Sequence, residues 1–234
     1  MSSLTRDPRF PASVWEAPVR IWHWAMALSL VVLAITGFLI SSPPTAGPGE
    51  AHENFIFGYT RFAHFAAGYI FTALLAYRVA WAFLGNRYSR EIFLVPITVL
   101  KPSFWRDVIG VLQHYLFMVR DEDAEHHVGH NPLAMTAMFA MYLAGSVFMI
   151  VTGFSLYGEG LGMQSWAYSW FTSWVNPLFG QSQDVHTWHR LGMWYLIWFT
   201  MIHMYFATRE DLTSGLTVIG SMINGWRRVK DPKK

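Results

Sequence analysis

The sequence predicts an all-α fold, an integral membrane four-helix bundle with a cytoplasmic surface helix. Of its 234 residues, 53% are hydrophobic and only 14% are charged, which is apolar for a water-soluble domain of this length. Four stretches reach the roughly 20 apolar residues that a helix needs to cross a bilayer. Cysteine is absent, which excludes disulfides, covalently attached c-type haem and iron–sulfur clusters held by this chain.

The predicted spans cover about residues 20–41, 60–84, 132–157 and 186–208, and we expect the whole chain, 1–234, to form a single transmembrane domain. The residues before Arg20 are polar, contain three prolines and lack a small-residue cleavage site, so we expect the first span to be retained rather than removed as a signal peptide. Residues 104–119 are apolar but interrupted by Arg106 and Asp107, which favours a helix lying on the membrane surface.

The distribution of Lys and Arg predicts the orientation. Residues 42–60 and 158–188 contain neither, whereas the N-terminal tail, the loop 85–130 and the C-terminal tail hold nearly all of them. By the positive-inside rule both termini are cytoplasmic, in the inner membrane of the cell, and an even number of spans agrees. The formal net charge of +2 is too small to indicate a nucleic-acid partner.

Four histidines fall within predicted spans and sort into two pairs at matched depth. His23 and His203 are near the cytoplasmic ends of their spans, and His64 and His189 are near the outer ends. His189 and His203 are 14 residues apart (203 − 189 = 14), which is about four helical turns, so both emerge on one helix face about 21 Å apart. For the histidines in loops or surface segments we expect solvation or ordinary hydrogen bonds: His52, His114, His126, His127 and His130.

Two imidazoles at each of two depths suit two b-type haems, because a porphyrin supplies four nitrogens and needs one axial ligand on each side. Zinc would ordinarily need three or four protein ligands close together, and an interhelical hydrogen bond is the simpler alternative for any one histidine. His186, three residues before His189, is an alternative outer ligand. Three arginines close to these histidines are candidate partners of the haem propionates, although snorkelling to the interface also explains them: Arg20, Arg61 and Arg190.

Glycines in or near the spans have two explanations. They allow either a flat macrocycle or a neighbouring helix to approach closely, and the sequence does not choose between the two. These residues are Gly37, Gly68, Gly153 and Gly192.

Several strings closely resemble the b-type cytochrome subunit of membrane-bound nickel–iron hydrogenases: EAPVRIWHW (16–24), GYTRFAHF (58–65), GNRYSRE (85–91), GHNPLA (129–134), VFMIVTGF (147–154), DVHTWHRLGMW (184–194) and REDL (209–212). The resemblance extends from about Trp15 to Arg228. It implies a subunit that anchors the small and large subunits of a periplasmic hydrogenase in membrane lipid and passes their electrons to quinone, with no hydrogen-splitting centre of its own. His23, His64, His189 and His203 fall on the family's haem-ligand positions.

Two further sites are expected. A quinone site should lie near the cytoplasmic haem, where His130 and Asn131 could donate to a carbonyl and Glu210 could relay protons; alternatively, Asn131 before Pro132 is a helix N-cap. In residues 158–183, Trp166, Trp170 and Trp174 are spaced by four, which predicts an aromatic helix face for the lipid interface or for a partner surface.

Two other functions stay open. One is a di-haem cytochrome b oxidoreductase that acts on a small molecule without a hydrogenase partner. The other is a haem-free transporter that uses intramembrane histidines as a relay.

Overall fold

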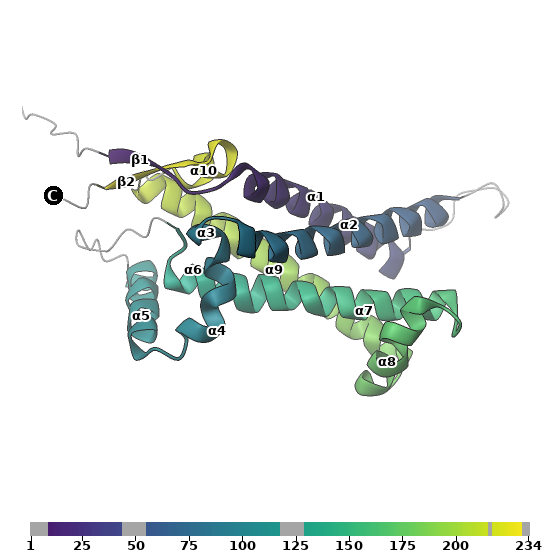
Figure 1. Ribbon diagram of the computed structural model, residues 1–234. Coiled ribbons are helices and arrows are strands. Elements are labelled where there is room, and N and C mark those ends of the chain that lie inside the picture. The colour runs from purple at the N-terminus through teal and green to yellow at the C-terminus, as the bar shows by residue number, and fades with distance from the viewer. Residues whose placement is uncertain (1–8, 44–54, 118–128, 215–216, 231–234) are drawn as a thin grey trace, which may run out of the picture. The chain divides into compact units, whose positions relative to one another are not determined.

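The computed structural model describes residues 9–43, 55–117, 129–214 and 217–230 (Figure 1). His52, His126 and His127 therefore lie outside the described residues. The elements in chain order are β1 (Arg9–Ser13), α1 (Ala17–Ser41), α2 (Ile56–Leu84), α3 (Arg87–Arg90), η2 (Glu91–Leu94), α4 (Val95–Thr98), α5 (Pro102–Phe117), α6 (Pro132–Ala137), η3 (Met138–Leu143), α7 (Ala144–Leu161), η4 (Tyr168–Thr172), α8 (Ser173–Phe179), α9 (Ser182–Ser214), α10 (Val218–Asn224) and β2 (Trp226–Lys230).

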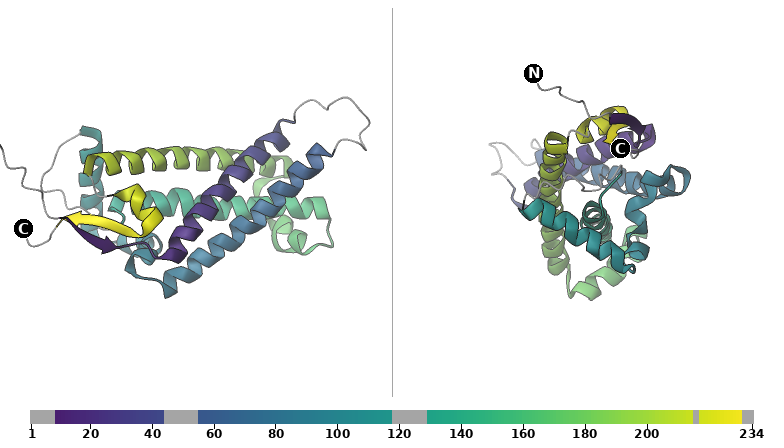
Figure 2. Two further views of the ribbon diagram at one scale, coloured as in Figure 1. Left: turned by 90° about the horizontal axis from the view of Figure 1, so that it is seen from above. Right: turned by 90° about the vertical axis from the view of Figure 1, so that its left-hand side faces the viewer.

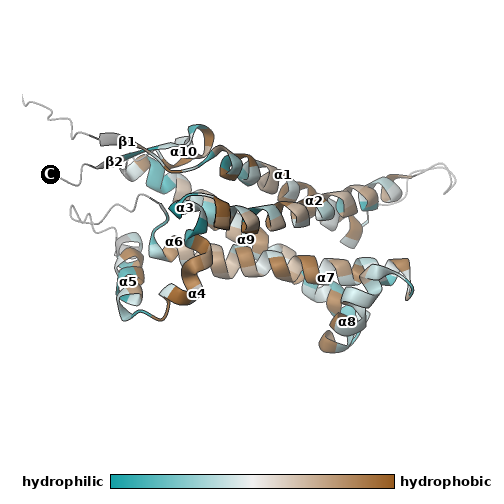
Figure 3. Ribbon diagram, viewed as in Figure 1, coloured by the Kyte–Doolittle hydropathy of each residue, from teal (hydrophilic) through white to brown (hydrophobic). Residues whose placement is uncertain are grey.

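The four predicted spans are helical, and so is the predicted surface helix as far as the structure describes it, over residues 104–117. Three helices are long and apolar enough to cross a membrane: α1, α2 and the continuous run Pro132–Leu161 formed by α6, η3 and α7. Among the described residues no other helix meets that criterion. The fourth region lies within α9, a helix of 33 residues that also carries Arg190, Arg209 and Glu210, so the count of four spans stays a prediction. Figure 3 shows the apolar residues along α1, α2 and α7.

The chain forms two compact units. The first, called here the helical unit, comprises Trp22–Arg78 and Met141–Thr200. It holds most of α1 and α2, together with α7, η4, α8 and the first part of α9. Figure 2 shows α1 and α2 running side by side in opposite directions within it. Its large apolar side chains are often exposed, for example Leu28 at 66%, as expected of helix faces that meet lipid.

Small polar residues occupy the centre of the helical unit. Ser146, Thr152 and Ser155 on α7 are fully or almost fully buried. Thr172 on η4 donates a hydrogen bond to the carbonyl of Ser155 at 2.7 Å. Small side chains and hydroxyl groups of this kind let helices approach closely in a membrane protein.

The second unit, called here the terminal unit, comprises Met1–Ile21, Val79–Ala140 and Met201–Lys234. It contains a two-stranded antiparallel sheet in which β1 pairs with β2, with Ser13 opposite Trp226. The sequence predicted only helices, so this small sheet is an unpredicted element of the fold. Gly225 separates α10 from β2 with φ of 90°, a left-handed conformation that favours glycine, and its carbonyl accepts hydrogen bonds from the backbone N–H groups of Val14 and Trp15.

Glu16 joins the N-terminal segment of the terminal unit to the end of α2. One oxygen of its carboxylate, Oε2, accepts hydrogen bonds from the backbone of Asn86 at 2.9 Å, from the Trp81 indole at 3.2 Å and from the Ser89 hydroxyl at 3.3 Å. The Asn86 side chain caps α3 through Ser89 N and donates to the carbonyl of Val14 at 2.9 Å.

Candidate functional site

A cavity of 760 Å³ lies within the helical unit and is lined by residues of α1, α2, α7 and α9. His64 from α2 and His189 from α9 both line it. Its volume is within the range of about 300–1,000 Å³ that is usual for cofactor sites. The predicted outer ligand pair thus shares one cavity.

Both histidines are held in the same way. His64 Nδ1 is 2.8 Å from the hydroxyl oxygen of Thr36 on α1, and His189 Nδ1 is 2.8 Å from that of Thr152 on α7. Each threonine hydroxyl also donates to a carbonyl of its own helix, at 2.7 Å and 2.8 Å. Since the hydroxyl hydrogen is used there, the threonine oxygen accepts from Nδ1–H, and Nε2 of each imidazole keeps the lone pair that a metal ligand requires.

The cavity wall fits a flat, carboxylate-bearing group. At Gly68, which lines the cavity, an added Cβ would meet nothing within 4 Å, so this wall is open. Arg61 and Arg190 also line the cavity, and its described lining contains no aspartate or glutamate. Two arginines without an acidic neighbour there suit the propionates of a haem.

The alternative outer ligand, His186, lines the same cavity but differs from His189 in its surroundings. It is exposed, and its Nδ1 lies 3.0 Å from the Ser182 carbonyl of its own helix. His189 is more enclosed and is held by a neighbouring helix. The contacts therefore favour His189, although His186 also has Nε2 available.

The predicted inner pair is divided between the two units. His23, in the helical unit, lies between the rings of Trp22 and Trp24, with ring centroids 6.5 Å and 5.1 Å away. His203 belongs to the terminal unit. Their pairing stays a prediction. Arg20, the predicted propionate partner on this side, donates from Nη1 to the Ile223 carbonyl within the terminal unit.

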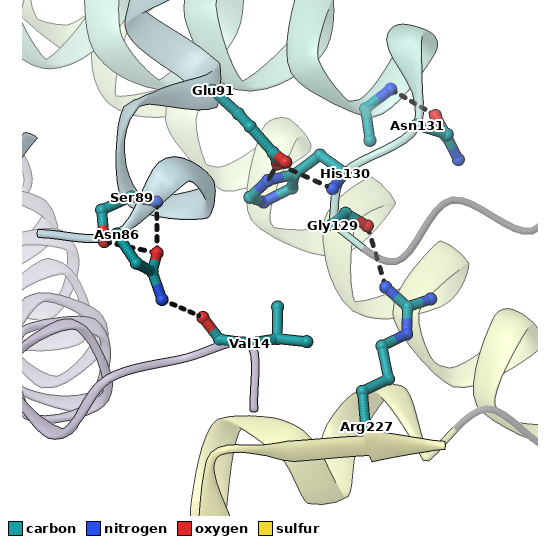
Figure 4. Close-up of polar contacts among 9 residues, drawn as sticks. Val14, Asn86, Ser89, Glu91, Gly129, His130, Asn131 and Arg227 are labelled. Carbon is teal, nitrogen blue, oxygen red and sulfur yellow. Dashed lines mark hydrogen bonds and ion pairs between the residues drawn. The ribbon is translucent and has the colours of Figure 1, made fainter. Parts of the chain in front are cut away.

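Two of the predicted quinone residues, His130 and Asn131, lie in a polar cluster of the terminal unit (Figure 4). Glu91 Oε2 accepts from the His130 backbone N–H at 2.9 Å and lies 3.0 Å from His130 Nδ1. Both side chains are 21% exposed. The Trp15 ring packs on the His130 imidazole with centroids 5.0 Å apart, and Arg227 donates to the Gly129 carbonyl at 2.8 Å.

Asn131 connects this cluster to α5. Its side-chain oxygen accepts from Ala134 N at 2.7 Å, so its N-cap role is confirmed. Its amide nitrogen donates to the Tyr115 hydroxyl at 3.2 Å, and that hydroxyl is 3.4 Å from Glu210 Oε2. Burial raises the pKa of the Tyr115 phenol, and the negative charge of Glu210 adds to this effect.

Several residues that build these sites were missed by sequence reasoning. Thr36 and Thr152 had a signal, since each begins a Thr-Gly-Phe string. Glu91 ends the string GNRYSRE, but nothing local connects it with His130. The glycines singled out in the sequence differ in what they contact. Gly37 and Gly153 lie against the two histidine rings, whereas Gly192 packs against Met149 and Phe148 of α7.

The chain is similar to known proteins along most of its length. The family described as prokaryotic cytochrome b561 matches residues 14–225. A protein of Azotobacter vinelandii named "Probable Ni/Fe-hydrogenase B-type cytochrome subunit" is 52% identical over 220 residues, covering 94% of this chain and 90% of its own length. A protein of Escherichia coli K12 named "Probable Ni/Fe-hydrogenase 1 B-type cytochrome subunit" is 46% identical over 218 residues, covering 93% and 91%.

Proposed function

The chain belongs to the prokaryotic cytochrome b561 family, and from this premise we propose that it is the membrane-anchoring di-haem b cytochrome that carries electrons from a periplasmic nickel–iron hydrogenase to the quinone pool. The observation that carries the proposal is the shared cavity of His64 and His189. The names of the similar proteins support a nickel–iron hydrogenase as the partner, and we propose that the chain anchors its small and large subunits.

The family implies b-type haem, and we propose two haems in this chain. His64 and His189 would hold the outer one, with Arg61 and Arg190 at its propionates. His23 and His203 would hold the inner one, with Arg20 nearby. When bound, the haems supply reversible one-electron transfer at two depths of the membrane. The buried hydroxyl groups of Thr36 and Thr152 would keep His64 and His189 in the orientation of a ligand before the haem binds.

The proposed location is the inner membrane, with both termini cytoplasmic. The described helices α1, α2 and Pro132–Leu161 are long and apolar enough to cross a membrane, and most Lys and Arg residues lie in the tails and the loop 85–130, apart from Arg61, Arg78 and Arg190. With this orientation the His64–His189 cavity faces the periplasmic side and the polar cluster of the terminal unit faces the cytoplasm.

We place the quinone site at the polar cluster around His130. Since the Glu91 carboxylate only accepts hydrogen bonds, His130 Nδ1 donates to it, and Nε2 is the ring nitrogen left for a quinone carbonyl, to which it donates when the imidazole is protonated at both nitrogens. Asn131, Tyr115 and Glu210 form a chain of polar groups beside it, which supports a proton route. The buried guanidinium of Arg227 adds a positive charge; burial lowers its pKa and the nearby carboxylates, Glu210 first, oppose this.

A docking surface for the hydrogenase is proposed on η4 and α8. Trp170 lies on η4 and Trp174 on α8, while Trp166 comes two residues before η4, and the three side chains have exposures of 74%, 47% and 49% in that order. Aromatic side chains of this kind suit both a protein interface and the lipid boundary. If the partner contact is real, the double substitution Trp170→Ala with Trp174→Ala releases the hydrogenase on purification, whereas unchanged attachment contradicts it.

The function is tested by a reduced-minus-oxidised spectrum of the purified complex, together with a haem-to-protein ratio. We expect two bis-histidine, low-spin haems per chain. His64→Ala should remove only the outer haem and His203→Ala only the inner one. Retention of both haems in both variants would refute the ligand assignment. Purification without hydrogenase subunits would favour the oxidoreductase alternative, and absence of a Soret band would favour a haem-free transporter.

A further inference from the structure

The tripeptide Thr-Gly-Phe occurs twice in the helical unit, once on α1 as residues 36–38 and once on α7 as residues 152–154. Each copy precedes a helix that carries a histidine of the cavity. The copy on α1 precedes α2 with His64, and the copy on α7 precedes α9 with His189. The two copies also make equivalent contacts with these histidines.

The threonine of each copy binds the histidine through Nδ1. Both distances are 2.8 Å, and in both cases the hydroxyl also donates to the carbonyl four residues earlier, Val32 for Thr36 and Phe148 for Thr152. Both threonines are buried, with exposures of 8% and 1%. Such a doubly bonded hydroxyl has a fixed direction, so it defines the plane and the tautomer of the imidazole.

The glycine of each copy makes room for the imidazole ring that the threonine of that copy binds. A Cβ added at Gly37 would lie 3.5 Å from His64 Cε1, and one added at Gly153 would lie 3.2 Å from His189 Cε1. The first is an ordinary contact, and the second is tighter than a side chain normally makes. The backbone of both helices thus passes directly beside the histidine that its threonine binds.

We propose that the two Thr-Gly-Phe segments are a duplicated holder for the axial ligands of the outer haem, in which Thr36 and Thr152 are positioning residues that set its reduction potential. The proposal rests on the proposed function, because it takes His64 and His189 as the ligand pair. The proposal adds Thr36 and Thr152 to the outer haem site, and it explains why the Thr-Gly-Phe tripeptide occurs twice. The two hairpins α1–α2 and α7–α9 would then contribute equivalent halves of one site.

The direction of the effect follows from ligand basicity. A histidine that donates its Nδ1–H to an acceptor is a stronger electron donor at Nε2, and a stronger donor favours the ferric iron over the ferrous iron. Replacing the hydroxyl by a methyl group removes the acceptor and leaves Nδ1–H buried without it. The outer haem should therefore become easier to reduce.

The experiment is a spectroscopic redox titration of the purified full complex carrying Thr36→Val or Thr152→Val. For each variant we expect the equilibrium between ferric and ferrous outer haem to shift about threefold toward the ferrous form, which is about 28 mV because tenfold corresponds to about 59 mV for one electron. Thr36→Ser and Thr152→Ser keep the hydroxyl and should titrate close to the unsubstituted protein.

Thr60→Val is the matched control. Thr60 lies on the same helix as His64 and donates to the Ile56 carbonyl at 2.8 Å in the same i−4 pattern, but it does not line the cavity. This substitution should leave the potential unchanged. If it shifts the potential as much as Thr36→Val does, the histidine contact is not the cause and the proposal fails.

The remaining outcomes are also decisive. Loss of the outer haem from the valine variants but not from the serine variants supports the holder. Wild-type potentials in both valine variants, or loss of haem from the serine variants too, overturn it. If His64→Ala and His189→Ala keep the outer haem, the ligand assignment itself is wrong, which is a different failure from an unchanged potential in the threonine variants.

Discussion

A single carboxylate oxygen of Glu91 binds both the backbone N–H and the ring of His130. Such a double contact fixes where the histidine lies and which ring nitrogen carries the proton toward Glu91. Gly129 immediately before it is equally specific, since a Cβ at this position would lie 2.2 Å from Glu91 Oε1 and 2.5 Å from Oε2. Two strings far apart in the sequence, GNRYSRE and GHNPLA, meet at this point.

Gly129→Ala should break the Glu91–His130 contact. The clashing atoms are the far end of a side chain, so Glu91 moves and the backbone stays. Loss of a hydrogen bond to a charged group costs about 1.5–3 kcal/mol, which we expect to see as a lower midpoint of thermal unfolding in detergent. Gly110→Ala is the control, because an added Cβ there meets nothing within 4 Å. Equal stability of the two variants would contradict the assignment.

The quinone site is tested by His130→Ala, Asn131→Ala and Glu210→Gln. Each should slow hydrogen-driven quinone reduction while both haems stay bound and reducible by hydrogen, because the residues belong to the terminal unit and do not line the His64–His189 cavity. We expect about 10²-fold slowing for His130→Ala, the low end of what a positioned proton donor contributes. Normal quinone turnover in all three variants would place the site elsewhere.

At the scale of the elements, α7 and η4 pack with almost no space between them. A Cβ at Gly158 would lie 2.5 Å from the Thr172 hydroxyl and 2.6 Å from the backbone of Ala167 and Tyr168. The hydrogen bond from Thr172 to the Ser155 carbonyl depends on this approach. The segment that carries the proposed docking surface is therefore held to α7 by a glycine and two small polar residues.

Gly158→Ala should separate η4 from α7, since backbone atoms cannot move aside as a flexible side chain can. Overpacking of this kind costs about 1–3 kcal/mol, so we expect earlier unfolding by tryptophan fluorescence and weaker hydrogenase attachment. Gly160→Ala, two residues further along the same helix, meets nothing within 4 Å and should behave like the unsubstituted protein. Matching behaviour of the two variants would refute this packing argument.

The helices could be predicted from the sequence because length and apolarity are local properties. The predicted region 132–157 and the observed run Pro132–Leu161 begin at the same residue, where Asn131 caps the helix. The sheet of β1 and β2 was not predicted, because it joins residues 9–13 to residues 226–230 and neither segment alternates clearly. Pro11 also makes β1 look like a loop.

The site was partly predictable for the same reason. Histidines at matched depth are visible in a sequence once the spans are known, and so are arginines on the side that lacks positive charge. The repeated Thr-Gly-Phe string marks Thr36 and Thr152, but their contacts are not visible in the sequence, because the two residues are 28 and 37 residues from the histidines they bind. Threonine in a helix usually bonds only to its own backbone, so the string alone does not predict a contact with a histidine.

At the scale of the whole molecule, the basic residues and the histidines describe one direction of transfer. In the proposed orientation, the Lys and Arg residues of the tails and of the loop 85–130 lie on the cytoplasmic side, as the positive-inside rule favours. The proposed outer ligand pair would then face the hydrogenase side, and the proposed quinone site at the Glu91–His130 cluster would face the side from which quinone takes up protons. With this proposed arrangement, an electron delivered to quinone crosses the bilayer toward the negative side.

This crossing predicts that hydrogen-driven quinone reduction works against the membrane potential. Moving one electron fully across costs about 2.3 kcal/mol per 100 mV, so collapsing the potential with an uncoupler should speed quinone reduction in sealed, respiring membranes. Reduction of an impermeant dye by the hydrogenase at the outer face crosses no membrane and should not respond. If the uncoupler changes neither rate, or both equally, quinone is reduced on the same side as hydrogen is oxidised, and the orientation or the quinone site proposed for this chain is wrong.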